Sequence, residues 1–76
     1  MVSVNIMLNT INDVKNFVNT VSKYEFEVDL TSGRYVIDAK SIMGIFSLDL
    51  SKPIKLEANC AEDSKFAEEI KPFTIQ

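Results

Sequence analysis

The spacing of apolar residues changes early in the chain, and this change limits the folds that the chain can adopt. Over residues 2–8 apolar side chains occupy alternate positions, which is the period of a strand with one buried face. Over residues 11–21 they fall three or four positions apart, which is typical of one face of a helix that begins at Ile11. Asn9 or Thr10 is well suited to cap that helix. The chain therefore opens with a strand followed directly by a helix.

Alternation returns over residues 25–30 and again over residues 34–39, on either side of a Thr-Ser-Gly turn signal. This pattern predicts a hairpin. Its inward side chains are predicted to be Phe26, Val28 and Leu30 on the first strand and Tyr35, Ile37 and Ala39 on the second. The outward carboxylates, Glu25, Glu27 and Asp29, are interpreted as a solvated sheet face, because residues two apart on one strand lack a convergent third metal ligand.

Three further elements complete the pattern. Ser41 heads a short apolar stretch that we interpret as a helix, and residues 54–58 alternate as a fourth strand. Glu62, Asp63 and Ser64 are expected to open a last helix, with Phe66, Ala67 and Ile70 on its apolar side and an end near Pro72. The predicted order is βαββαβα. We expect a single domain over residues 1–76, of the α+β class, with helices on one face of a four-stranded sheet.

The composition excludes several kinds of chemistry. The chain has no histidine, which rules out an imidazole base, a nucleophile paired with histidine and a histidine-ligated zinc. Cys60 is the single cysteine and is expected to be a partly buried filler. No Gly-rich phosphate loop and no activated nucleophile is evident. We therefore expect no enzyme activity, no metal and no cofactor.

The charge pattern bears on partners. The net charge is −3 and the eight basic residues are scattered, which argues against direct binding of nucleic acid. No apolar run approaches the ~20 residues of a membrane span, and the N-terminus has no signal-peptide pattern. We expect a cytoplasmic protein whose partners are other proteins.

One segment is recognisable. The run Ala-Lys-Ser-Ile-Met-Gly-Ile-Phe-Ser-Leu at residues 39–48 resembles the regulatory-serine segment of HPr, the small phosphocarrier family of the bacterial sugar phosphotransferase system (PTS). Residues 20–24 resemble the end of that family's first helix, and the similarity runs without a gap from about residue 2 to residue 52. Beyond it, this chain is slightly shorter before its fourth strand. The resemblance implies an HPr-like open-faced β-sandwich, with an antiparallel sheet covered on one face.

The same register shows a departure from the family. HPr proteins have a Gly-[Leu/Ile]-His-Ala-Arg-Pro run between the first strand and the first helix, and residues 8–13 of this chain read Leu-Asn-Thr-Ile-Asn-Asp. Thr10 takes the place of the phosphorylated histidine, Asn12 that of the arginine and Asp13 that of the proline. A phosphothreonine ester is a low-energy bond, and Asp13 repels an incoming phosphate. The resemblance therefore implies a family member without phosphohistidine carrier activity.

Two candidate sites follow from the resemblance. Ser41 matches the serine that an ATP-dependent HPr kinase modifies; the alternative is that it is only a helix N-cap. Ile42, Met43 and Phe46 match a partner-docking surface; the alternative is that they fill the core, although we expect Met43 and Phe46 to be exposed. Lys40 and Lys23 are candidates to meet an acidic partner, or have no specific role.

Two functions remain open on this reading. The first is a regulatory HPr paralogue, controlled by phosphorylation at Ser41. It is similar in logic to the catabolite-repression homologue of HPr, whose partners are an HPr kinase and a LacI-type regulator. The second is a divergent, unmodified adaptor that binds one partner protein through Met43 and Phe46.

Overall fold

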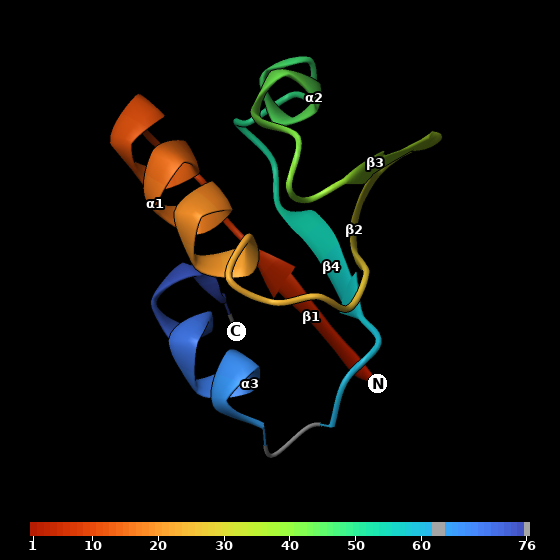
Figure 1. Cartoon of the computed structure of the whole chain (residues 1–76). Coiled ribbons are helices and arrows are strands. Elements are labelled where there is room, and N and C mark those ends of the chain that lie inside the picture. Colours follow the sequence, from red (N-terminus) through yellow and green to blue (C-terminus); the bar gives the residue numbers. More distant parts are fainter. Residues whose placement is uncertain (62–63, 76) are drawn as a thin grey trace.

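The computed structural model describes residues 1–61 and 64–75, and its elements follow the predicted order (Figure 1). They are β1 (Val2–Ile6), α1 (Ile11–Val21), β2 (Val28–Ser32), β3 (Tyr35–Asp38), α2 (Ile42–Phe46), β4 (Ile54–Ala58), α3 (Lys65–Glu69) and the short 3-10 helix η1 (Lys71–Phe73). Among these, no helix is long and apolar enough to span a bilayer.

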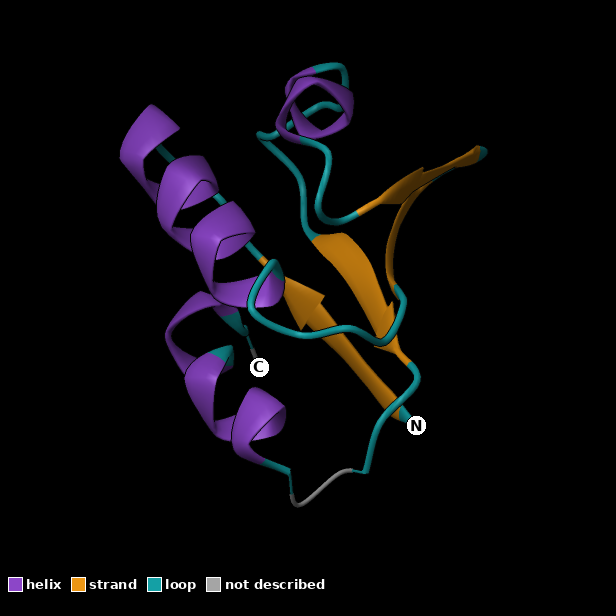
Figure 2. Ribbon diagram, in the orientation of Figure 1, coloured by secondary structure: helices purple, strands orange, loops and turns teal. Residues whose placement is uncertain are grey.

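The four strands form one antiparallel sheet in the order β1-β4-β2-β3. The last strand of the sequence therefore lies inside the sheet, where Ala58 of β4 is opposite both Val2 of β1 and Val28 of β2. The three α-helices lie on one side of the sheet (Figure 2). The α+β fold with helices on one face is the predicted one.

The core lies between the sheet and the helices. Its two largest fully buried side chains are Phe17 of α1 and Phe66 of α3. Phe17 meets the ring of Phe73 edge to face, with 5.4 Å between centroids. The side chains that the structure shows as buried are all apolar, so burial of apolar surface is the main stabilising term.

The predicted first strand of the hairpin is wrong at its start. The structure places β2 at Val28–Ser32, so residues 25–27 lie outside the ladder. The Lys40 ammonium donates hydrogen bonds to the backbone carbonyls of Tyr24 (2.6 Å) and Phe26 (3.1 Å). The Phe26 ring is half-buried against Phe66, with 5.1 Å between centroids, so its inward direction is as expected.

Two residues assigned to apolar faces are exposed. Ile11 is 63% exposed, because the buried stripe of α1 begins one turn later at Val14. Tyr35 is 70% exposed, although its position opposite Ser32 places both residues on the same face of the hairpin, the one predicted to point inward. The tip of the β2–β3 hairpin, which turns at Gly33 (φ 60°), extends away from the helices in Figure 1, and this accounts for the exposure of the tyrosine.

The last helix begins at Lys65, with Ser64 as its N-cap. The predicted roles of Glu62 and Asp63 in opening it lie outside the described residues. Phe66 and Ile70 are buried as expected, and the predicted end near Pro72 corresponds to η1.

Candidate partner-binding site

The start of α1 is closed by a reciprocal capping box. Thr10 is the N-cap, and its hydroxyl oxygen accepts a hydrogen bond from the backbone N–H of Asp13 at 3.0 Å. In return, one carboxylate oxygen of Asp13 accepts from the backbone N–H groups of Thr10 (3.2 Å) and Asn9 (3.1 Å). Of the two predicted caps, the structure selects Thr10.

This arrangement determines what the helix start can do chemically. Backbone N–H groups at a helix N-terminus ordinarily attract anions such as phosphate. Here two N–H groups at the entry to α1 already bind the carboxylate of Asp13, which adds a full negative charge. The neighbouring Asn12 is exposed and neutral. A phosphoryl group therefore meets a negatively charged position at the start of α1.

The start of α2 is arranged differently. Ser41 is its N-cap, and the exposed hydroxyl accepts a hydrogen bond from the Gly44 N–H at 3.2 Å. The backbone N–H of Ser41 donates to the carbonyl of Asp38 at 3.0 Å. A side chain at Gly44 would place its Cβ 3.2 Å from the Ser41 hydroxyl oxygen. Glycine thus keeps room beside that hydroxyl.

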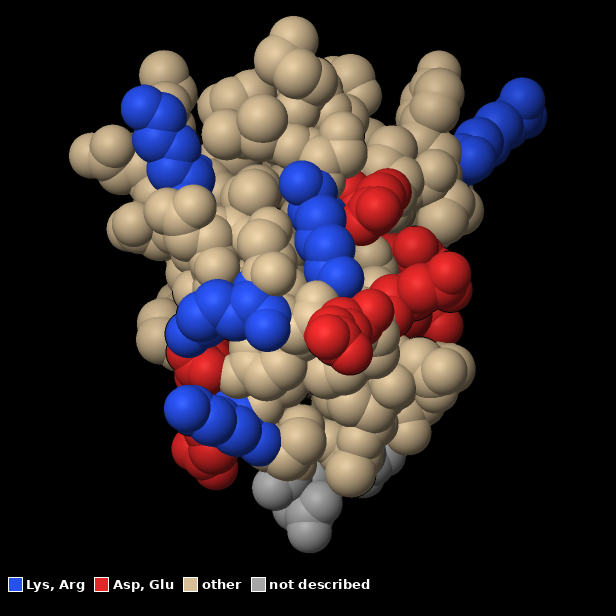
Figure 3. All heavy atoms as spheres, in the orientation of Figure 1, with Lys and Arg blue, Asp and Glu red and all other residues tan. Residues whose placement is uncertain are grey.

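The outer side of α2 is apolar and exposed. Met43 is 76% exposed and Phe46 is 41% exposed, as expected, whereas Ile45 is fully buried and Ile42 is half-buried. We call Ile42, Met43 and Phe46 the α2 surface. Figure 3 shows no charged side chain over α2 in this view.

The sequence analysis missed one neighbour of this surface. The N-terminal end of α1 lies at the same end of the molecule as α2 (Figure 1), and the two helices are in contact. The exposed Ile11, which its spacing had assigned to the apolar face of the helix, therefore adds an apolar side chain at that end. Its position directly after the N-cap was the available signal, because the first helical residue lies before the first buried turn.

The two lysines proposed for an acidic partner bind within the protein. Lys40 donates to two backbone carbonyls, as described above, and Lys23 forms an ion pair with Glu69. Glu69 also accepts a hydrogen bond from the hydroxyl of Tyr24, and this bond raises the pKa of Tyr24 to about 12. The hydrogen bonds from Lys23 and then Tyr24 lower the pKa of the Glu69 carboxyl.

The remaining candidate residues give the following picture. Cys60 is half-buried against the core, and the Ser64 hydroxyl lies 3.6 Å from its sulfur. The carboxylates of Glu25, Glu27 and Asp29 lie on exposed residues. Within residues 1–61 and 64–75 no three side chains of the ligating types are grouped to hold a metal ion.

Comparison with known proteins decides the family. The family model described as "PTS HPr component phosphorylation site" matches residues 13–74. The chain belongs to the HPr family. The matched range includes Ser41 and the α2 surface of this HPr-family chain, and it begins after Thr10 and Asn12.

Solved HPr structures share the fold. HPr-C-His from Thermoanaerobacter tengcongensis is 27% identical, with a TM-score of 0.75 over 92% of this chain and 86% of that one. HPr from Bacillus anthracis is 17% identical, with a TM-score of 0.72 over 97% and 96% of the two chains. The histidine-containing phosphocarrier protein of a Mycoplasma is also 17% identical, with a TM-score of 0.70 over 93% and 86%. A search among curated protein sequences found no match.

Proposed function

We propose that this chain is a regulatory or binding member of the HPr family that transfers no phosphoryl group through histidine and is not an enzyme. In this proposal it acts by binding partner proteins through the α2 surface. The observation that supports it most is the capping box of Thr10 and Asp13 in a chain without histidine. No residue there has the chemistry of the relay.

The chemical argument has three steps. A relay needs a nitrogen–phosphorus bond that passes its group onward, and the Thr10 hydroxyl forms only a stable ester. Asn12 lacks the guanidinium that pairs with phosphate through two hydrogen bonds. Asp13 adds a carboxylate charge at the helix N-terminus, where an anion would otherwise be favoured. Each step opposes phosphoryl transfer independently.

We further propose that phosphorylation at Ser41 regulates the binding. The hydroxyl is exposed, and it lies two residues before Met43 at the rim of the α2 surface. A phosphate adds a charge of about −1.5 to −2 there, which favours a partner that presents arginine and disfavours one suited to the uncharged apolar surface. An HPr kinase and a LacI-type regulator are the partners that the family suggests.

One observation favours the unmodified adaptor as a second candidate. The Ser41 hydroxyl already has a structural role, because it caps α2 through the Gly44 N–H. A cap alone accounts for serine at this position. In this candidate, Met43 and Phe46 bind one partner without any modification.

The test has two arms. In the first, the chain is incubated with enzyme I and phosphoenolpyruvate beside a histidine-containing HPr, and we expect label only on the control. A Thr10→His variant should remain poor, and a Thr10→His, Asn12→Arg, Asp13→Ala variant should improve. An acid-labile phosphoryl group on the parent chain would refute the proposal.

In the second arm, the chain and its Ser41→Ala variant are incubated with HPr kinase and ATP, and the peptides are analysed by mass spectrometry. Regulation predicts one phosphate, on Ser41, that is absent from the variant. If the parent chain stays unmodified with every cognate kinase of its source cell, the unmodified adaptor is the better explanation.

A further inference from the structure

The outer edge of β1 already accepts a short antiparallel strand. The backbone N–H of Met7 donates to the carbonyl of Phe73 at 2.9 Å, and the N–H of Ile75 donates to the carbonyl of Asn5 at 3.0 Å. These bonds flank an antiparallel bridge between Ile6 and Thr74. Thr74 and Ile75 thus continue the sheet beyond β1.

The pairing of the described residues reaches Asn5 and does not include Ser3. Backbone groups on a strand alternate between its two neighbours, so the outward groups of Asn5 and Met7 place those of Ser3 on the same outer edge. β1 pairs with β4 through its other edge. Among the described residues, none pairs with Ser3 on the outer side. An unpaired strand edge of this kind is a template for another strand.

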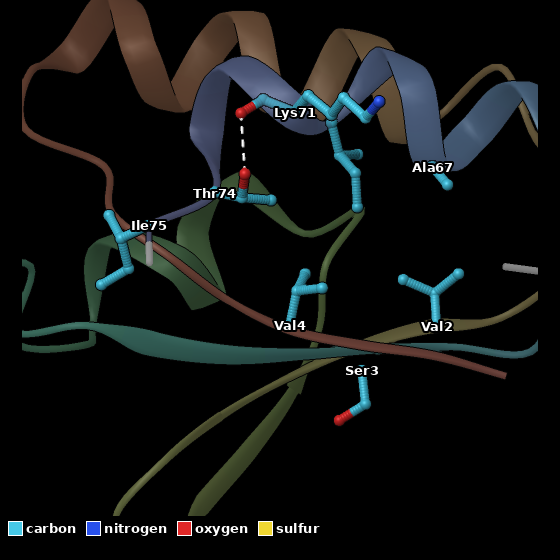
Figure 4. A pocket seen from close by; sticks show the side chains of 8 residues that line it. Val2, Ser3, Val4, Ala67, Lys71, Thr74 and Ile75 are labelled. Carbon is cyan, nitrogen blue, oxygen red and sulfur yellow. Dashed lines mark hydrogen bonds between the residues drawn. The ribbon is translucent and has the colours of Figure 1, made fainter. Parts of the chain in front are cut away.

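A groove of about 460 Å³ lies beside this edge, between β1 and the α3–η1 segment. In Figure 4, the side chains of Val2 and Val4 point from β1 into it, Ala67 of α3 faces them from the other wall, and the Ser3 side chain points away. Ile70 and Ile75 add further apolar lining. The groove thus combines unpaired backbone groups with apolar walls.

We propose that the outer edge of β1 binds an extended peptide segment of a partner protein by strand addition. The pairing of Thr74 and Ile75 sets the direction, because the added strand continues along β1 antiparallel to it. The peptide bonds through the N–H and carbonyl of Ser3, and it presents apolar side chains at alternate positions to the groove. This site goes beyond the proposed function, since α2 lies at the opposite end of the molecule (Figure 1).

A peptide fits this site better than a second copy of the chain. In each copy Ile75 already covers Asn5, so two β1 edges would share only residues 2–4. Each copy also has its own α3 above that edge. A single extended strand is narrow enough to pair with Ser3 and to fill the groove between β1 and Ala67.

The test is a titration of the 15N-labelled full chain with an acetylated six-residue peptide of alternating valine and threonine. We expect chemical-shift changes that are confined to residues 2–4, Ala67, Lys71 and Ile75. We also expect the hydrogen exchange of the Ser3 amide to slow about tenfold. The control is the same peptide with N-methyl groups on its backbone nitrogens, which removes its donors. Equal binding of the methylated peptide, absence of binding at millimolar peptide, or protection of β3 instead of Ser3 would overturn the proposal.

Two variants at one position give a matched comparison. Ser3→Pro removes the outward N–H, and an edge strand tolerates proline when that N–H faces solvent. Ser3→Ala changes only a side chain that points away from the groove. We expect about tenfold weaker peptide binding for Ser3→Pro and parental binding for Ser3→Ala.

If Ser3→Pro does not fold, the methylated peptide tests the same hydrogen bonds. The proposal would be refuted if the Ser3 amide became protected from hydrogen exchange without peptide as the protein concentration rises. That result would assign the edge to a second copy of the chain.

Discussion

Replacing Asp13 with alanine tests whether the start of α1 supplies its own anion. One carboxylate oxygen accepts two backbone N–H groups, at 3.1 and 3.2 Å, and its charge lies in the first turn of the helix. Both N–H groups are exposed and can bind water instead, so the lost capping interaction costs about 1 kcal/mol. The lost interaction with the helix dipole adds about 0.5 kcal/mol. The sum, about 1.5 kcal/mol, lowers the Tm of a domain of this size by about 6–12 °C.

Thermal unfolding followed by circular dichroism measures this change. Asp13→Asn is the matched control, because it keeps an acceptor without the charge and should lose about half as much. Without the carboxylate charge, the helix N-terminus of Asp13→Ala should attract an anion. Sulfate in place of chloride, at equal ionic strength, should therefore raise the Tm of this variant more than that of the parent chain. If Asp13→Ala has the same Tm as the parent chain, and sulfate does not raise it further, the capping-box argument is wrong.

Three further predictions follow from the same structure. Ser41→Ala should lower the free energy of unfolding by about 1 kcal/mol through the lost cap, and Ser41→Asp should retain it; denaturant titration compares the two. On α2, Ile45→Ala should cost about 2–4 kcal/mol because the side chain is fully buried, whereas the exposed Met43→Ala should stay within about 0.5 kcal/mol in the same titration. The Glu69 hydrogen bond raises the pKa of Tyr24 from 10.0 to about 12, so its contribution to stability is present below pH 10 and is lost as the pH rises through about 12. Unfolding measured against pH should show a smaller alkaline loss for Tyr24→Phe.

Local sequence signals predicted the helix starts and the exposed side of α2. Thr10 and Ser41 were predictable as caps because their side chains bond to N–H groups only three residues away. The exposure of Met43 and Phe46 was predictable because so short a helix has too little inner surface for every apolar residue of the segment.

Features that depend on distant segments were not predictable. Lys40 bonds to carbonyls 14 and 16 residues before it, and no local pattern indicates that its ammonium is used there rather than by a partner. Tyr35 alternates correctly with Ile37, but exposure depends on whether a helix lies above the strand. The edge of β1 became a candidate site only after the strand order and the pairing of Ile75 were known. The roles of Ser41 and the α2 surface remain predictions.

The position of β4 has a consequence for how this chain folds. β4 lies between β1 and β2 in the sheet, and the pair Val2–Ala58 links residues far apart in the sequence. During synthesis, α1 and the β2–β3 hairpin have all of their local contacts before β4 emerges, but β1 has no neighbour in the sheet until then. High contact order of this kind slows folding. The nascent chain therefore has a first strand without a paired neighbour until β4 is present, and its sheet is complete only after β4 has joined β1 to β2.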